Sequence, residues 1–237
     1  MIIQNWQDTA AYKHLLEYSG AQWAWEFLRR NPGYQEEWIA FDLVWRALED
    51  KYGKAPNRNF CAWKNDPRAW VLAADDSGGD CRVDEDKVLI ECAMGARWGF
   101  YKFPPNPLDN DVIEGQRLTW REQQMDDMLL TEPSLQQFDV ENGVVVVFEL
   151  DMPLKDQLDR AKRELQMEQR YRRRQQGMQM RTIGRIADQL ILQLRYLDAL
   201  AAGLSIDAMD FLQEDTAENA IQYRDKGYLK LLQLPAI

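Results

Sequence analysis

The spacing of apolar residues changes twice along this chain of 237 residues, and each change limits the secondary structure that a segment can form. The first third carries apolar side chains at intervals of three and four residues, typical of one buried helical face: Trp38, Phe41, Trp45 and Leu48. From about Trp70, short apolar runs alternate with Gly, Asp and Ser, which is typical of strands and turns. Helical spacing returns from Leu154 onward. We therefore predict an α+β fold with a small central antiparallel sheet between two helical parts.

The first part of the chain is rich in tryptophan, with seven of the nine tryptophans placed before residue 71. Apolar residues predict short helices at 12–16 and 23–28, the second closed by Pro32 and Gly33. We expect residues 1–66 to form a helical domain in which the tryptophans build a core, because large aromatic side chains dominate burial in small domains. Stacking of the tryptophans on nucleic-acid bases is the functional alternative.

The central part, residues 67–151, is predicted to hold the antiparallel sheet. Its apolar runs predict strands at residues 70–74, 88–93 and 98–103. Thr119 followed by Glu122 resembles a capping box that opens a helix to about Leu130. Asn142-Gly143 then separates 137–140 from 144–150, and this dipeptide favours the tight turn of a β-hairpin.

The last part, residues 152–237, is predicted to be helical. Asp151 and Pro153 indicate a helix start, and apolar positions support the first three turns, after which Arg and Gln dominate to Gly177. The far end of this helix should therefore project into solvent or onto a partner. A second apolar stripe runs from Ile183 to Ala201, followed by Gly203 and by Ser205 as an expected N-cap, which together predict a helix-turn-helix-like unit.

Positive charge is concentrated in one stretch of an otherwise acidic chain, whose net charge is −10. Residues 155–185 hold ten Lys/Arg and four Asp/Glu. Planar guanidinium groups suit phosphate oxygens, so nucleic acid is the partner that this stretch favours. The candidate phosphate contacts are Arg170, Arg172, Arg173, Arg174, Arg181 and Arg185, with Lys226 near the C-terminus as a secondary candidate.

A solvated helix with intrahelical ion pairs is the alternative explanation of this stretch. Three carboxylates precede arginines at the favourable i,i+4 spacing: Asp156 with Arg160, Asp159 with Arg163, and Glu168 with Arg172. The expected recognition helix after Ser205 also argues against DNA binding, because it is acidic and would be repelled by the DNA backbone. If Ser205 or its flanks approach bases, the phosphate contacts must come from the arginines.

The sequence gives little support for an enzyme or a metal protein. His14 is the only histidine, and no phosphate-binding or dinucleotide-binding glycine motif is present. Cys61, Cys81 and Cys92 form no CxxC pair, so we expect reduced, partly buried thiols and no metal or cofactor. No segment approaches the length of a membrane helix, and we expect a soluble, cytoplasmic protein without a membrane partner.

Two parts of the chain resemble known regulator families. Residues 23–34, WAWEFLRRNPGY, resemble the signature of a proteobacterial transcriptional regulator-like N-terminal domain. The C-terminal segments LRYLDA at 194–199, AGLS at 202–205 and GYLKLL at 227–232 resemble the pattern of the RovC-type DNA-binding domain. Both halves in this order are similar to RovC-like bacterial transcriptional activators. Within the first motif, Arg29 and Arg30 fit a structural role as cations at a helix end better than contact with DNA or a neighbouring subunit.

The resemblance implies a transcriptional activator that binds double-stranded promoter DNA as a homo-oligomer, with a hexamer as one form. By the same resemblance, the targets would be type VI secretion genes or the transfer genes of mobile elements, and RNA polymerase is a further expected partner. Several copies would also bring several basic helices onto one duplex although each subunit is acidic. The alternative is an antiactivator or adaptor that acts through protein contacts and never touches DNA.

Overall fold

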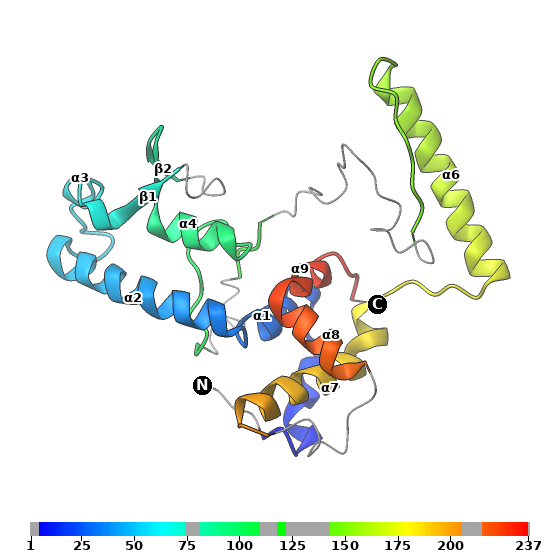
Figure 1. Ribbon diagram of the computed structural model, residues 1–237, viewed down its shortest axis with the longest axis horizontal. Coiled ribbons are helices and arrows are strands. Elements are labelled where there is room, and N and C mark those ends of the chain that lie inside the picture. Colours follow the sequence, from blue (N-terminus) through cyan, green and yellow to red (C-terminus); the bar gives the residue numbers. More distant parts are fainter. Residues whose placement is uncertain (1–4, 74–80, 110–117, 122–142, 205–214, 237) are drawn as a thin grey trace. The chain divides into compact units, whose positions relative to one another are not determined.

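The computed structural model describes residues 5–73, 81–109, 118–121, 143–204 and 215–236 (Figure 1). The chain forms two compact units, one from residues 1–123 with 181–237 and the other from residues 124–180. Helices predominate beside one small antiparallel sheet, which confirms the predicted α+β class. No helix in the described ranges is both long enough and apolar enough to span a lipid bilayer.

Three helical segments open the first unit: a 3-10 segment Thr9–Glu17, then α1 (Gly20–Leu28) and α2 (Pro32–Tyr52). The prediction that Pro32 and Gly33 end a helix is wrong, because they begin α2. The Asn31 side chain accepts a hydrogen bond from the backbone N–H of Tyr34, and proline in the first turn lacks only an N–H that needs no intrahelical partner. The predicted apolar stripe from Trp38 to Leu48 lies on α2.

The sheet follows the short segments α3 (Phe60–Trp63) and the 3-10 turn Pro67–Ala69. Its strands are β1 (Trp70–Leu72), β2 (Arg82–Asp84) and β3 (Lys87–Leu89), in the order β1-β3-β2 with antiparallel pairing throughout. The predicted strand at 88–93 is correct only to Leu89, since α4 (Ile90–Arg97) begins at the next residue. A short, wholly apolar run does not distinguish a buried strand from a buried helix.

Two other sheet predictions differ from the structure. Of residues 98–103, only Phe100 makes a β-bridge, to Trp120, so this segment is not a strand. Residues 144–150 are also not a strand in the described region; the side-chain amide of Gln157 bonds both the N–H and the C=O of Glu149 instead. The other half of the predicted hairpin, 137–140, and the predicted helix from Glu122 to Leu130 lie outside the described residues.

The second unit contains α6 (Leu154–Gln175), and the first contains α7 (Ile183–Ala201), α8 (Thr216–Gln222), a π-helical turn Tyr223–Gly227 and α9 (Tyr228–Leu231). Helices α6 and α7 end where the sequence predicts, whereas Pro153 and not Asp151 is the N-cap of α6, and the bounds of the helices after residue 215 were not predicted. Gly177 and Gly203 follow α6 and α7 with φ of +67° and +83°, a conformation that favours glycine after a helix end. Ser205 and the expected recognition helix lie outside the described residues, so the helix-turn-helix-like unit stays a prediction.

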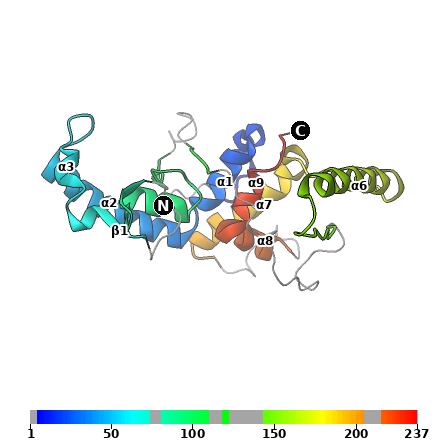
Figure 2. The ribbon, with the colours of Figure 1, turned by 90° about the horizontal axis from the view of Figure 1, so that it is seen from above.

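The main core of the first unit is built by both ends of the chain. Trp23, Trp25 and Phe27 of α1 are fully buried in one cluster with Leu194 of α7 and Leu231 of α9. Figure 2 shows α1, α7 and α9 gathered together, and α1 contacts both other helices. The N-terminal helices thus share their core with the C-terminal helices. The predicted division of the chain into separate domains, with boundaries after residues 66 and 151, stays a prediction.

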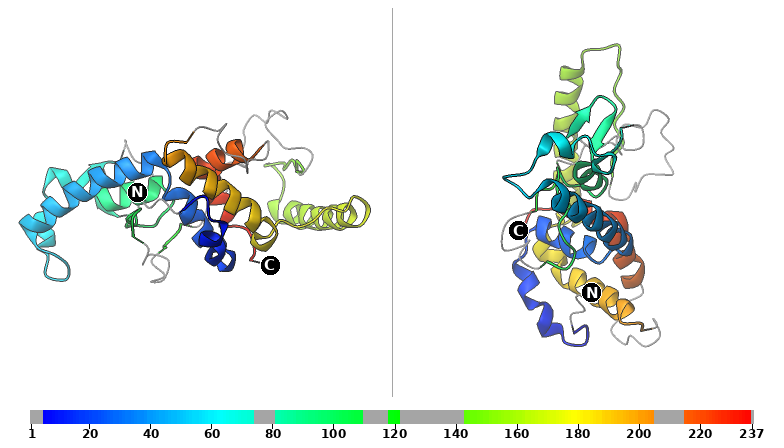
Figure 3. Two further views of the ribbon diagram at one scale, coloured as in Figure 1. Left: turned by 90° about the horizontal axis from the view of Figure 1, so that it is seen from below. Right: turned by 90° about the vertical axis from the view of Figure 1, so that its left-hand side faces the viewer.

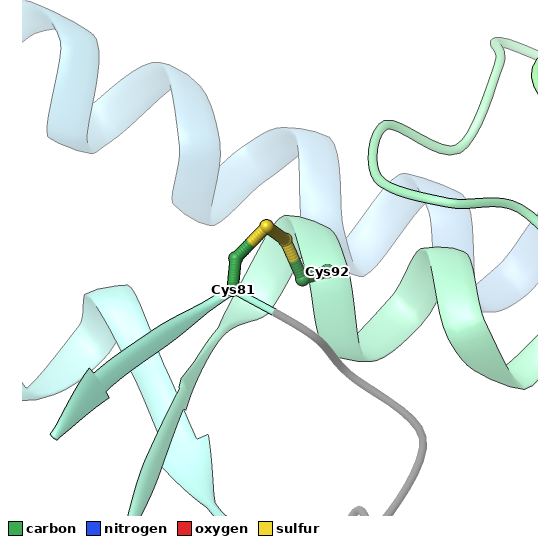
Figure 4. Close-up of a disulfide and its surroundings, with 2 residues drawn as sticks. All are labelled: Cys81 and Cys92. Atoms are coloured by element: carbon green, nitrogen blue, oxygen red, sulfur yellow. A yellow bond between two sulfur atoms is a disulfide. The ribbon is translucent and has the colours of Figure 1, made fainter.

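A smaller layer holds the sheet, where α2 and α4 lie side by side (Figure 3). Here the expectation of three reduced thiols is wrong for two of them, because Cys81 and Cys92 form a disulfide (Figure 4). Pairing of β2 with β3, followed directly by α4, brings their Cα atoms to 5.8 Å, within the range that a disulfide requires. Cys61 is free and exposed.

Candidate nucleic-acid interface

Helix α6 is exposed along almost its whole length. Of its 22 residues, only Ala161 is buried. Its apolar side faces the segment that precedes it, which runs beside the helix in Figure 1, and the two border an open groove of about 380 Å³. The groove is lined by Phe148, Leu158, Ala161, Lys162, Leu165, Gln166 and Gln169. The outer side of the helix is left to its charged residues.

Three exposed arginines lie near the end of the helix. Arg170, Arg173 and Arg174 are exposed and stand at i, i+3 and i+4, which places them on one face and within about 6 Å along the axis. In the part of the chain that the structure describes, no carboxylate lies within salt-bridge distance of these three guanidinium groups. Their donors are therefore available to an external anion.

Arg172 differs from its neighbours, because its Nε donates to Glu168 Oε1 at 2.7 Å and its side chain is only 18% exposed. This pair is one of the three i,i+4 pairs expected from the sequence. Asp156 with Arg160 and Asp159 with Arg163, all within described residues, are not in salt-bridge contact. The solvated-helix explanation therefore accounts for Arg172 and leaves the other three arginines of this cluster unexplained.

The charge along α6 is strongly asymmetric. Between Leu154 and Gln175 there are eight Lys/Arg and four Asp/Glu, a net charge of +4, and Arg172, Arg173 and Arg174 all lie in the last turn. Cations at this end complement the partial negative charge of the helix C-terminus, which stabilises the helix. The same placement concentrates the positive field at an exposed tip, where a phosphate backbone would be attracted.

The remaining candidate phosphate contacts lie in the first unit. Arg181 is exposed just before α7, Arg185 is exposed in its first turn, and Lys226 is exposed in the π-helical turn. Arg224 beside it is bound to Asp225, with 2.7 Å between Nε and Oδ1. Ser205 lies outside the described residues.

The structural role expected for Arg29 and Arg30 is confirmed. Arg29 is buried, and its Nε donates to the Pro107 carbonyl at 3.0 Å. Arg30 donates two hydrogen bonds to the Asp198 carboxylate, at 2.8 and 3.0 Å, and also binds Glu26. Burial alone would lower the pKa of Arg30, but the charges of Asp198 and Glu26 raise it overall. Neither arginine is available to DNA.

Asp198 and Tyr12 complete a buried polar cluster that sequence reasoning missed. The Tyr12 hydroxyl donates to Asp198 Oδ2 at 2.6 Å, and burial, reinforced by the Asp198 charge, raises the pKa of Tyr12. The cluster joins the 23–34 motif to the LRYLDA motif of α7. The available signal was the position of Asp198 inside an apolar helical stripe, where an unpaired carboxylate would be costly.

The tryptophans of the first part of the chain form a core. Trp23, Trp25 and Trp63 are fully buried, and Trp45 packs on Trp63 with ring centroids 4.7 Å apart. The Arg58 guanidinium lies 3.8 Å from the centroid of the Trp63 ring, so one face of this ring is already covered by a cation. These rings are therefore not presented to nucleic-acid bases. Within the described residues, no group of three or more His, Cys, Asp or Glu is placed to hold a metal ion.

Comparison with known proteins identifies one segment. Residues 5–58 match the family model of the proteobacterial transcriptional regulator-like domain. This span covers the 3-10 segment, α1 and α2, and it contains Tyr12, Glu26 and Arg30 of the buried cluster. Searches of curated proteins and of solved structures gave no match. The match supports a bacterial regulator of transcription and a regulatory role for the chain.

Proposed function

We propose that this protein is a DNA-binding transcriptional regulator in which the exposed end of α6 neutralises backbone phosphates. The regulator-like domain at residues 5–58 supports the regulatory part of this proposal. The DNA-binding part is supported by one observation above all: Arg170, Arg173 and Arg174 are exposed on one helical face without an intramolecular partner in the described structure. An unpaired cluster of this kind stabilises little within the fold and suits an external polyanion.

The shape of α6 is compatible with a duplex. A helix of 22 residues is about 33 Å long, and its diameter of about 10–12 Å matches the width of the DNA major groove. Because all four carboxylates of α6 precede Arg170 and would be repelled by phosphates, the arginine tip is the part that we place on the backbone. Arg181, Arg185 and Lys226 are further phosphate contacts in this proposal, and the Ser205 region supplies contacts to bases.

The finer parts of the proposal concern the regulatory outcome. We place the protein at promoters as an activator and a homo-oligomer, with type VI secretion or mobile-element transfer genes as targets and RNA polymerase as a partner. Assembly of several subunits would add the fields of several α6 tips on one duplex, which offsets the repulsion expected from a chain of net charge −10.

Fluorescence anisotropy of a pool of bacterial promoter duplexes, titrated with the purified protein at several salt concentrations, tests the proposal. We expect binding that weakens steeply with salt and that, for some duplexes, survives unrelated competitor DNA. Absence of binding even at low salt would overturn the DNA-binding part and leave the regulatory role.

A second candidate function is supported by the other side of α6. Val144, Val145, Val147, Leu150 and Leu158 are between 40% and 86% exposed; Leu158 lines the groove, and the other four belong to the segment that precedes α6 and contributes Phe148 to the groove. Apolar side chains gathered at an exposed groove are typical of protein-binding surfaces. An adaptor or antiactivator that docks another regulator there would bind no DNA, so the same anisotropy experiment distinguishes the two functions.

A further inference from the structure

The disulfide joins two elements of the small sheet layer. Cys81 lies directly before β2, and Cys92 lies in the first turn of α4, eleven residues later in the chain (Figure 4). The bond therefore fastens an edge strand of the sheet to the helix that follows the sheet. Neither cysteine belongs to the main core formed by α1, α7 and α9.

The two cysteines are held close together by contacts that do not involve sulfur. The backbone N–H of Leu89 donates to the Cys81 carbonyl at 3.0 Å, and Arg82 pairs with Val88 across the two strands. Since β3 continues directly into α4, this pairing also positions Cys92. Both thiols would thus remain neighbours when the bond is broken, and the bond can form again without refolding of the chain.

Apart from this backbone pairing, few contacts in the described residues fix β2 in place. It is a three-residue edge strand with an irregular register, and the exposed side chains of Arg82 and Asp84 bond only to residues 85–87 in the adjoining turn and β3. Among the residues that the structure describes, the cluster around the disulfide contains three buried members, Val88, Cys92 and Ala93. Loss of the bond should therefore loosen β2 locally, because segments with little buried apolar surface open most easily.

The two sulfur-bearing residues also differ in accessibility. Cys92 is fully buried, whereas Cys81 is partly exposed. An incoming thiolate or peroxide therefore reaches Cys81 first, and Cys92 acts as the resolving or leaving thiol.

We propose that Cys81 and Cys92 form a reversible redox pair that clamps β2 to α4 when oxidised and releases β2 when reduced. The inference rests in part on the proposed function, since a transcriptional regulator works where glutathione and thioredoxin-class dithiols keep thiols reduced, so that a disulfide there is a changeable state.

Both directions of the reaction balance with common cellular reagents. In oxidation, the Cys81 thiolate attacks hydrogen peroxide and becomes a sulfenic acid with loss of hydroxide; the Cys92 thiolate then attacks the Cys81 sulfur and expels a second hydroxide, and both are protonated to water. In reduction, one thiolate of a dithiol attacks the Cys81 sulfur and releases the Cys92 thiol. The second thiol of the reductant then attacks the mixed disulfide, frees Cys81 and leaves the reductant oxidised.

Redox titration of the full-length protein tests this pair. In a Cys61→Ser background, the protein is equilibrated with mixtures of reduced and oxidised glutathione, quenched with acid, alkylated and analysed by mass spectrometry. We expect a graded conversion between dithiol and disulfide while the helical circular dichroism stays unchanged. Hydrogen exchange of a peptide covering residues 81–89 should be faster by about tenfold or more in the dithiol form, with α1 and α7 unchanged.

Two results would overturn the proposal: failure of the thiols to form a bond under excess oxidised glutathione, or reduction only after global unfolding. Cys81→Ser serves as the matched variant, because it removes the bond at the partly exposed position and leaves the buried Cys92 intact. It should show the faster exchange of the reduced protein under every redox condition. No DNA is present in these measurements, so their outcome is separate from the test of DNA binding.

Discussion

Arg30 at the end of α1 and Asp198 in α7 form a buried ion pair. The two residues lie 168 positions apart in the sequence, and two hydrogen bonds of 2.8 and 3.0 Å join their side chains. Tyr12 donates a third hydrogen bond to the same carboxylate. The segment that matches the regulator-like domain, residues 5–58, is thereby tied to the C-terminal part of the chain. In this protein the family segment shares its main core with α7 and α9.

Removal of one partner of this pair should be strongly destabilising. We expect Arg30→Ala to lower the free energy of unfolding by about 3–5 kcal/mol, because it removes the guanidinium that compensates the buried Asp198 charge. Asp198→Ala should cost less, because Arg30 keeps its ion pair with Glu26. Urea denaturation measures the change, with Arg46→Ala as the control: Arg46 also pairs with an aspartate, Asp42, but its side chain is 69% exposed, so its removal should have a far smaller effect. Equal effects of Arg30→Ala and Arg46→Ala would contradict the structural role of the buried pair.

The approach of α1 to α9 requires glycine at position 20. A Cβ atom there would lie 2.1 Å from the carbonyl oxygen of Leu231, so Gly20→Ala must push the two backbones apart. We expect a loss of about 3 kcal/mol or more in thermal or urea unfolding. Gly184→Ala in the first turn of α7 is the control, because its nearest neighbour is 3.3 Å away and alanine favours helix; it should change stability by less than about 1 kcal/mol. A mild effect at Gly20 would mean that α1 and α9 are not packed this closely.

Glu91 predicts a dependence of stability on pH. Burial raises the pKa of its carboxyl group, with the nearby positive charges of Lys102 and Arg58 opposing the shift, and its Oε2 has no hydrogen-bond partner. The folded chain then holds this proton more tightly than the unfolded chain does. The contribution of Glu91 to the free energy of unfolding is therefore complete at pH values below the pKa of Glu91 in the unfolded chain, and it is lost as the pH rises through the pKa of Glu91 in the folded chain.

Replacement of this carboxyl group should therefore stabilise the protein at neutral pH. We expect Glu91→Gln to raise the free energy of unfolding by about 1 kcal/mol near pH 7, with a smaller gain near pH 4, where the native carboxyl is protonated. Melting curves across this range give the comparison. Glu85→Gln, in the exposed turn between β2 and β3, should have no such effect. A gain at Glu91 that is independent of pH would contradict a buried, titrating carboxyl.

Periodicity was sufficient to predict the long helices. The stripes of α2, α6 and α7 and the glycines at 177 and 203 act locally, so the sequence alone predicts these helices and the C-terminal ends of α6 and α7. The start of α2 was missed, because Pro32 and Gly33 were interpreted as a helix end. The apolar run at 88–93 was ambiguous, because burial on all sides removes the alternation that separates strand from helix.

Long-range pairing was beyond the reach of sequence patterns. The Cys81–Cys92 bond depends on the β2–β3 register, and the Arg30–Asp198 pair depends on the packing of both chain ends into one core. In the candidate interface, the sequence placed the arginines on one exposed helix. It offered three i,i+4 ion pairs on α6 and did not show that, of these, Glu168–Arg172 is the one that forms, because the choice among neighbouring partners depends on side-chain conformation.

Contact between the arginine tip of α6 and DNA phosphates would make duplex binding depend on salt through these three side chains. Anisotropy titrations at several salt concentrations would compare the native protein with Arg170→Ala/Arg173→Ala/Arg174→Ala and with a control of equal charge change, Lys13→Ala/Arg46→Ala/Lys54→Ala, all exposed positions.

We expect the α6 variant to bind every duplex more weakly, with a slope of log affinity against log salt that is shallower by about 0.9 for each phosphate that is no longer neutralised, while the control keeps most of the native slope. An unchanged affinity and slope in the α6 variant would contradict the account and remove this helix from the interface.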